Sequence, residues 1–143
     1  MADAGSSTPV RDAPYRELDH RARIDRARRG VTVGEAIETM RTWSIPVAWF
    51  AAILGCSERQ WGRLRAGGLD ALLSPAASDR LLRARRALDH ARAVFDDERD
   101  TVAWMSAPND ALAGESPLSL LDTDAGVRLV EEALTRIEFG VYS

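Results

Sequence analysis

The chain has 143 residues, of which 45% are hydrophobic, and a formal net charge of −3. This length is enough for one domain of ordinary size, or for two small helical modules that share a core. One cysteine and two histidines exclude a disulfide framework and argue against a zinc site, and no apolar run approaches the roughly 20 residues that span a bilayer. We therefore expect a cytoplasmic protein with neither metal nor cofactor.

The chain begins with a polar stretch, MADAGSSTPVRDAP, over residues 1–14. This stretch has no apolar segment of the kind that a secretory signal requires, so we expect a disordered leader. After it, apolar residues recur at helical spacing, and nothing alternates like a strand for more than a few residues. The sequence therefore predicts an all-α fold.

Three helices are predicted before the first tight turn. A charged surface helix is expected over residues 16–29, ended by Gly30, and a second helix over residues 32–43. Pro46 stands early in a third helix, which Gly55 ends.

Two helices are predicted after that turn. Ser57 and Gln60 have the spacing of a capping box, in which each side chain satisfies a backbone amide of the other, and they start a short helix. Ser74, followed by a proline, starts the longest helix, expected over residues 75–97. Its apolar residues repeat at steps of three and four, which predicts a core stripe: Leu81, Ala84, Leu88, Ala91 and Phe95.

Residues 47–66, VAWFAAILGCSERQWGRLRA, have the spacing of a DNA-reading helix-turn-helix. Such a motif requires a small residue where its two helices cross, here Ala51, and a turn residue between them, here Gly55. The other internal positions require apolar side chains, which the sequence supplies: Phe50, Leu54, Cys56, Trp61 and Leu64.

If these residues face inward, the opposite surface of the second helix is polar. Arg59 and Arg63 are then placed to pair with guanines and Gln60 with an adenine, while further arginines suit phosphates. An alternative is a helix-turn-helix that serves only as a scaffold, with arginines that solvate it. The predicted DNA-binding residues are Ser57, Arg59, Gln60, Arg63, Arg65, Arg80 and Arg83.

The second half predicts a compact helical unit. A short helix ends near Met105, Ser116-Pro117 starts a single helical turn, and Asp122 or Thr123 caps a final helix that Gly140 ends. The apolar face of the final helix is Val127, Val130, Leu134 and Ile137.

Nothing in the sequence forms a catalytic constellation. There is no nucleophile–base pair, no metal-ligand spacing and no phosphate-cradling glycine loop, so an enzyme is the least supported reading. His20 and His90 lie among charged residues and are both expected on the surface.

The closing segment resembles the toxin-binding domain of the Xre/MbcA/ParS antitoxin family. The shared features are A-W with P-N-x-A-L-x-G, then P-x-x-L-L-x-T, then R-I-x-x-G-V-Y. The preceding part looks like the Xre-like half of that family, so the resemblance covers about residues 30–143. It implies a helix-turn-helix and dimerisation module over residues 15–98 and a toxin-binding module over residues 99–143.

The same resemblance implies an antitoxin of a type II toxin–antitoxin system. Its partner would be a RES-domain toxin, an enzyme that consumes NAD, and the antitoxin would also repress its own operon. A toxin that degrades NAD needs a cleft for a long dinucleotide, and an aromatic tail such as EFGVYS is suited to enter it. The expected toxin-binding residues are Arg136, Glu138, Phe139, Gly140, Val141, Tyr142 and Ser143.

Two points about this interpretation stay open. Phe139 could instead pack on the core of its own helix, which would leave residues 141–143 as the inserted segment. The whole protein could also be a helix-turn-helix regulator whose second half serves dimerisation or ligand sensing, or a binding module that no longer touches DNA.

The charge distribution predicts two different partners. Residues 59–92 hold eight arginines against three aspartates, whereas residues 101–143 hold two arginines against seven acidic residues. A basic middle and an acidic end suggest two different partners, one of them phosphate-bearing, and the alternative is that the charge only scatters over solvated helix faces. Because DNA-reading helices of this type work in pairs on two-fold sites, we expect a homodimer built from the first module.

Overall fold

The structure is a computed structural model that describes residues 19–140. The expected leader over residues 1–14, and Val141, Tyr142 and Ser143 of the expected tail, lie outside the described residues. The only β contact within residues 19–140 is an isolated bridge between Thr32 and Leu72, so the predicted all-α fold is confirmed. The elements are α1 (His20–Arg29), α2 (Val33–Thr42), α3 (Val47–Leu54), α4 (Glu58–Ala66), α5 (Pro75–Phe95), α6 (Glu98–Ser106), the 3₁₀ turns η4 (Asp110–Leu112) and η5 (Pro117–Leu120), and α7 (Asp124–Glu138).

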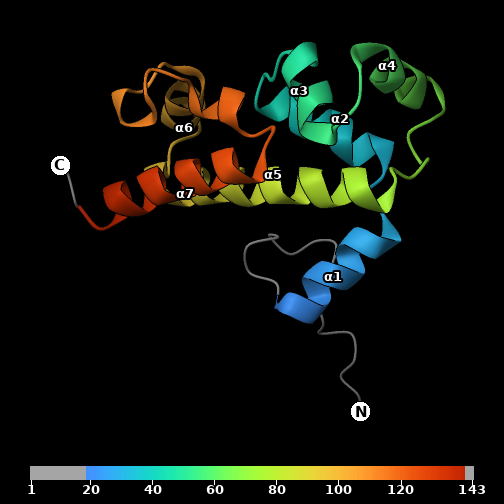
Figure 1. Cartoon of the computed structure of the whole chain (residues 1–143), viewed down its shortest axis with the longest axis horizontal. Helices are drawn as coiled ribbons and strands as arrows, with labels where there is room; N and C mark the ends of the chain where they lie inside the picture. Colours follow the sequence, from blue (N-terminus) through green and yellow to red (C-terminus); the bar gives the residue numbers. More distant parts are fainter. Residues whose placement is uncertain (1–18, 141–143) are drawn as a thin grey trace.

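The long helix α5 organises the molecule. It contacts α1, α3, α6 and α7, and α7 runs beside it while α1 lies on the side away from α2, α3 and α4 (Figure 1). One hydrophobic cluster extends from Ala27 in α1 to Leu134 in α7. The two predicted modules therefore share α5 as a common wall. The predicted apolar stripe of α5 is buried at every position except Phe95, which is half-buried. The Phe95 ring packs against Trp104, with 5.4 Å between the ring centroids.

Side-chain caps start the helices where the sequence predicts them. The Ser57 hydroxyl accepts a hydrogen bond from the Gln60 backbone amide at 3.1 Å, and the side-chain Oε1 of Gln60 accepts one from the Ser57 backbone amide at 2.8 Å. Ser74 caps α5 and Thr123 caps α7 through one side-chain hydrogen bond each, without the reciprocal bond. These contacts satisfy backbone N–H groups that a helix start leaves without partners. The predicted capping box and the predicted start of α5 are therefore confirmed.

The acidic segment after α5 differs from the prediction. The helix ends at Phe95 rather than near residue 97, because Asp96 adopts a left-handed conformation with φ +56°. Asp97 then caps α6 by accepting a hydrogen bond from the Asp100 amide at 2.9 Å. The acidic run is thus a tight corner between two helices, since aspartate side chains compete well for free amides at helix starts.

The final helix approaches the turn before it unusually closely. A Cβ atom added to Gly126 would collide with the carbonyl oxygen of Leu120, the last residue of η5. Leu118 and Leu121 are buried beside this contact, and Val127, Val130 and Leu134 face the core. The predicted apolar face of α7 is therefore confirmed at these three positions, while Ile137 is only half-buried. A glycine at position 126 allows the helix to pack against the turn.

Candidate functional site

Helices α3 and α4 pack as the helix-turn-helix spacing predicts. Ala51 is 2% exposed, and the rings of Phe50 and Trp61 are 5.1 Å apart between centroids. Gly55 ends α3 in a left-handed conformation with φ +80°. Cys56 is half-buried, and burial raises the pKa of its thiol, which disfavours the reactive thiolate. The internal positions of the motif are thus filled as expected, with Leu54 buried and Leu64 half-buried.

The outer surface of α4 carries the residues predicted to read bases. Arg59 and Arg63 are exposed, and neither forms a hydrogen bond or ion pair with another residue of the described chain. Arg65 lies over the Trp61 ring, with its guanidinium carbon 5.4 Å from the centroid. Ser57 and Gln60 are exposed but joined in the capping box. Reading an adenine through both the oxygen and the nitrogen of Gln60 would require its side chain to leave that cap.

The two arginines of α5 differ in their surroundings. The guanidinium of Arg80 lies directly against Gly55 and donates to the Leu54 carbonyl at 3.5 Å. Arg83 pairs with Asp79 at 3.4 Å and with Asp124, at the start of α7, at 3.2 Å. Arg80 therefore joins the turn of the motif, whereas Arg83 links α5 to the second half.

A groove of about 430 Å³ lies between α4 and the first turns of α5. Arg63 and Arg80 both line it, and its lining residues include no acidic side chain. Two guanidinium groups with no carboxylate among the lining residues create a local positive potential that favours an anion. The remaining lining residues are Leu54, Gly55, Cys56, Gln60, Leu64, Leu73, Ser74 and Ala77.

The outward surface of α7 is apolar at two positions. Phe139, just beyond the helix, is 74% exposed, and Leu129 is 48% exposed. The alternative that Phe139 packs on the core of its own helix is therefore wrong, because its side chain is largely exposed to solvent. The sequence analysis did not include Leu129 among the toxin-binding residues. The signal that could have found it is its position outside the spacing of the buried stripe Val127, Val130 and Leu134.

The other predicted toxin-binding residues that the structure describes lie around the end of α7. Arg136 is half-buried, and Gly140 follows Phe139 with φ +69°. The Gly140 amide donates to the Ile137 carbonyl at 3.1 Å and so ends the helix. Glu138 is exposed but bonded to a residue of α5.

That residue of α5 is His90, and its expected surface position is wrong. His90 is only 6% exposed because α7 covers the face of α5 on which it lies. Its Nε2 atom lies 2.9 Å from Glu138 Oε1, and its Nδ1 atom lies 3.4 Å from Glu131 Oε1. His20 is exposed at the start of α1, as expected.

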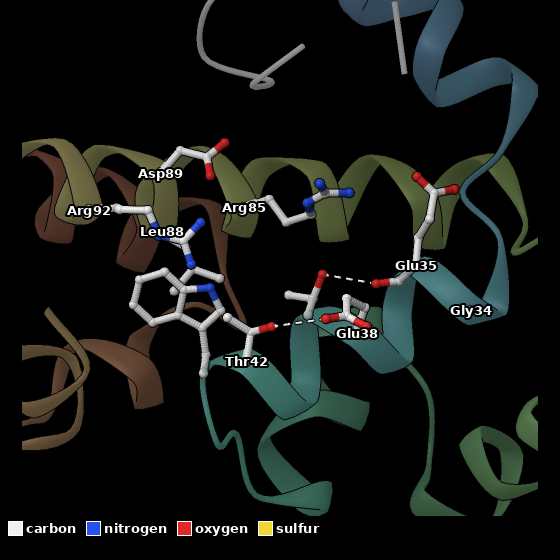
Figure 2. A pocket seen from close by; sticks show the side chains of 10 residues that line it. Gly34, Glu35, Glu38, Thr42, Arg85, Leu88, Asp89 and Arg92 are labelled. Carbon is white, nitrogen blue, oxygen red and sulfur yellow. Dashed lines mark hydrogen bonds between the residues drawn. The ribbon is translucent and has the colours of Figure 1, made fainter. Parts of the chain in front are cut away.

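A further cleft, of about 500 Å³, lies between α2 and α5. Figure 2 shows Arg85 and Arg92 on the α5 side and Glu38 and Thr42 on the α2 side. The Arg92 guanidinium lies 5.1 Å from the centroid of the Trp43 ring, which forms part of the wall. Both signs of charge line this cleft, so it has no net preference for an anion or a cation.

Two classes of feature are absent from residues 19–140. No group of three or more potential ligand residues is arranged to hold a metal ion there. Within the same range, none of the helices combines the length and apolar character that a membrane span requires.

Comparison with known proteins links this arrangement to one family. The model of the antitoxin Xre/MbcA/ParS C-terminal toxin-binding domain matches residues 90–140. An antitoxin Xre of Yersinia enterocolitica is 34% identical over 122 residues, which cover 84% of this chain and 80% of that protein. Antitoxin Xre proteins of Photorhabdus laumondii and Pseudomonas putida are 39% and 35% identical over 67 and 71 residues, in each case 45% of the relative.

Proposed function

The chain belongs to the Xre/MbcA/ParS-type antitoxins and acts in a toxin–antitoxin pair, and we propose that its partner is a RES-domain toxin that consumes NAD. The matched segment, residues 90–140, contains α6, α7 and the end of α5. We propose that toxin-binding extends over residues 99–143 and that the helix-turn-helix module covers residues 15–98. In this proposal the chain inhibits an enzyme and is not one itself, and the pair acts in the cytoplasm.

The observation that carries this proposal is the exposed apolar side chains on α7 and directly after it. Within the part of the matched segment that the structure describes, the large hydrophobic side chains left exposed are Leu129 and Phe139. Exposed apolar side chains in a segment that matches a toxin-binding domain favour a protein partner. Covering each of them would contribute roughly 1.5–3 kcal/mol to binding. We therefore propose that the toxin contacts the outer surface of α7.

We propose that the tail completes inhibition by entering the active site of the toxin. Arg136, Glu138, Phe139 and Gly140 form the base from which residues 141–143 continue. The ring of Tyr142 would fill an apolar subsite of the toxin.

Purification with the toxin tests the contact surface. Leu129→Ala and Phe139→Ala should each weaken binding of the co-encoded RES-domain protein by roughly tenfold or more, measured by calorimetry. Leu69→Ala is the matched control, because Leu69 is 63% exposed but lies outside the matched segment. Equal affinity in all four proteins would place the interface elsewhere.

Removal of residues 141–143 tests the tail separately. The truncated protein should keep its melting temperature and still bind the toxin, but it should fail to stop NAD consumption. Tyr142→Ala should show a weaker form of this split, with Tyr15→Ala as the control at the other tyrosine of the chain. Full inhibition by the truncated protein would contradict insertion of the tail.

A second function, binding of operator DNA, is favoured by the basic surface of α4. Arg59 and Arg63 are exposed and engage no other described residue, and the groove beside them lacks acidic lining residues. We propose that these two arginines read bases and that Arg65 and Arg80 bind phosphates. Ser57 and Gln60 would support the start of α4. Arg83 would contact a phosphate only by exchanging its aspartate partners. A homodimer would present two copies of α4 to the two halves of an operator site.

DNA-binding measurements at several salt concentrations test this second function. Arg59→Ala and Arg63→Ala should each cost about 1–3 kcal/mol on the operator and relax sequence preference. Arg80→Ala should weaken binding to all sequences and lower the salt slope by about one unit. Arg128→Ala, on α7, is the control with the same charge change. Tight binding by the Arg59→Ala/Arg63→Ala protein would exclude this surface.

The alternative of a regulator whose second half serves dimerisation or ligand sensing makes a different prediction. In that case DNA binding would respond to the Arg59 and Arg63 substitutions, but no RES-domain protein would co-purify. The same two experiments therefore distinguish the readings.

A further inference from the structure

A partly buried cluster of polar side chains joins α5 to the end of α7. His90 is 6% exposed and faces two carboxylates of α7, Glu131 and Glu138. Arg86, one turn earlier on α5, donates from Nε to Glu131 Oε2 at 2.7 Å. Two basic groups of one helix thus face two acidic groups of the other. This is the only place in the described chain where a buried histidine contacts carboxylates on another helix.

The two contacts of the imidazole ring act at different positions along α7. Glu131 lies near the middle of the helix, while Glu138 is its last residue and is followed directly by Phe139. The hydrogen bond of the ring is to Glu138, and its other nitrogen lies near Glu131, so one rigid group contacts both positions. Glu131 also has Arg86 as a partner, whereas the contact that Glu138 makes with another helix is the one to His90.

The end of α7 needs such a contact because few other interactions hold it. Leu134 is buried, but Ile137 is half-buried and Glu138, Phe139 and Gly140 are exposed. The last turn of a helix frays readily when its side chains bury little surface. The hydrogen bond to His90 restrains this turn from outside the helix.

We propose that His90 is a positioning residue for toxin binding: it holds the last turn of α7 against α5, so that Phe139 and Gly140 leave the helix in one direction. The inference rests on the proposed contact between the toxin and the end of α7. A pre-ordered end costs less conformational entropy when the toxin binds than a frayed one. His90 would thereby act through Glu138 without touching the toxin.

Amide hydrogen exchange in the free protein tests the positioning directly. The Phe139 amide donates to the Thr135 carbonyl and the Gly140 amide to the Ile137 carbonyl, both at 3.1 Å, so these two amides report on the last turn. In the His90→Leu protein they should exchange at least about tenfold faster, the change expected for loss of one charge-assisted hydrogen bond. The Val127 amide, bonded to the Thr123 carbonyl at the other end of α7, should change less than twofold.

A pair of substitutions separates positioning from general packing. Glu138→Ala should produce the same local increase as His90→Leu, and the double variant should add little, because both remove one contact. His90→Gln retains a donor and should restore part of the protection. Unchanged exchange at Phe139, additive effects, or an equal increase along all of α7 would overturn the proposal.

Toxin affinity measured on the same variants tests the functional part. His90→Leu should weaken binding of the co-encoded toxin by about tenfold, and His20→Leu, the same change at the exposed histidine, should not. Normal affinity despite faster exchange would show that the contact serves stability alone and would overturn the role in binding. If the wild-type protein binds no toxin, the proposed function fails and this role with it, whereas the exchange result still decides whether His90 holds the helix end.

Discussion

Substitution of Gly126 by alanine should strongly destabilise the second half of the protein. The new Cβ atom would collide with the Leu120 carbonyl oxygen and would lie 2.8 Å from its carbonyl carbon and 3.0 Å from Thr123 Oγ1. The obstructing atoms belong to the backbone, so α7 and η5 would have to move apart. Thr123 is also the N-cap of α7, which means that the movement would strain a second stabilising contact.

The size of the effect follows from two opposing contributions. Overpacking of a tight contact costs about 1–3 kcal/mol, and collision with backbone favours the upper end of that range. Replacing glycine by alanine within a helix recovers up to about 1 kcal/mol. We expect a net loss of about 2 kcal/mol in the free energy of unfolding. For a domain of this size, that corresponds to a melting temperature lower by roughly 6–10 °C.

A matched glycine provides the control. Gly62 lies within α4, and an added Cβ there meets nothing within 4 Å. Gly62→Ala should therefore raise stability by up to about 1 kcal/mol. Both proteins would be compared by denaturant unfolding and calorimetry. A Gly126→Ala protein as stable as the Gly62→Ala protein would refute the close approach of α7 to η5.

Three further substitutions test other parts of the fold. Ala51→Leu should overpack the crossing of α3 and α4, lower the free energy of unfolding by about 1–3 kcal/mol and abolish DNA binding. An unchanged melting temperature would contradict this crossing. Burial alone would raise the pKa of Glu35, but hydrogen bonds to Thr32 and the charge of Arg26 lower it overall to below 4.5. The lowered pKa contributes stability above pH 4.5, and this stability is lost as the pH falls through the pKa of the folded protein. Glu35→Gln should therefore reduce the loss of unfolding free energy at acid pH, measured by denaturation at several pH values. Arg83→Ala removes partly exposed ion pairs and should change the free energy of unfolding by at most about 1 kcal/mol in equilibrium denaturation.

The features predicted correctly from sequence depend on neighbours along the chain. The Ser57–Gln60 capping box, the start of α5 at Ser74 and the left-handed Gly55 each involve residues within a few positions of one another. Helix starts and ends are decided by such local hydrogen bonds and by backbone conformation, so residue type and spacing are sufficient evidence. The inward-facing positions of the helix-turn-helix follow from helical periodicity in the same way.

The errors concern residues whose surroundings come from distant parts of the chain. His90 lies among charged residues in sequence, yet Glu131 and Glu138 approach it from helix α7, 41 and 48 positions later. The ion pair of Arg83 with Asp124, which the sequence did not predict, also joins distant parts of the chain, although the proposed role of Arg83 at phosphates stays a prediction. The wrong alternative of a core-packed Phe139 depended in the same way on how α7 packs against α5.

The sequence by itself determined the all-α class, most helix boundaries and the residues on the inner side of each helix pair, because caps, glycine turns and apolar spacing act over short distances. The motifs of the closing segment indicated the family. Only the tertiary structure decided which polar side chains are buried and which apolar ones stay exposed. The packing of α7 on α5 encloses His90 between carboxylates while it leaves Leu129 and Phe139 facing solvent. Burial depends on the angle and register at which two helices meet, and many residues far apart in the chain set that geometry together.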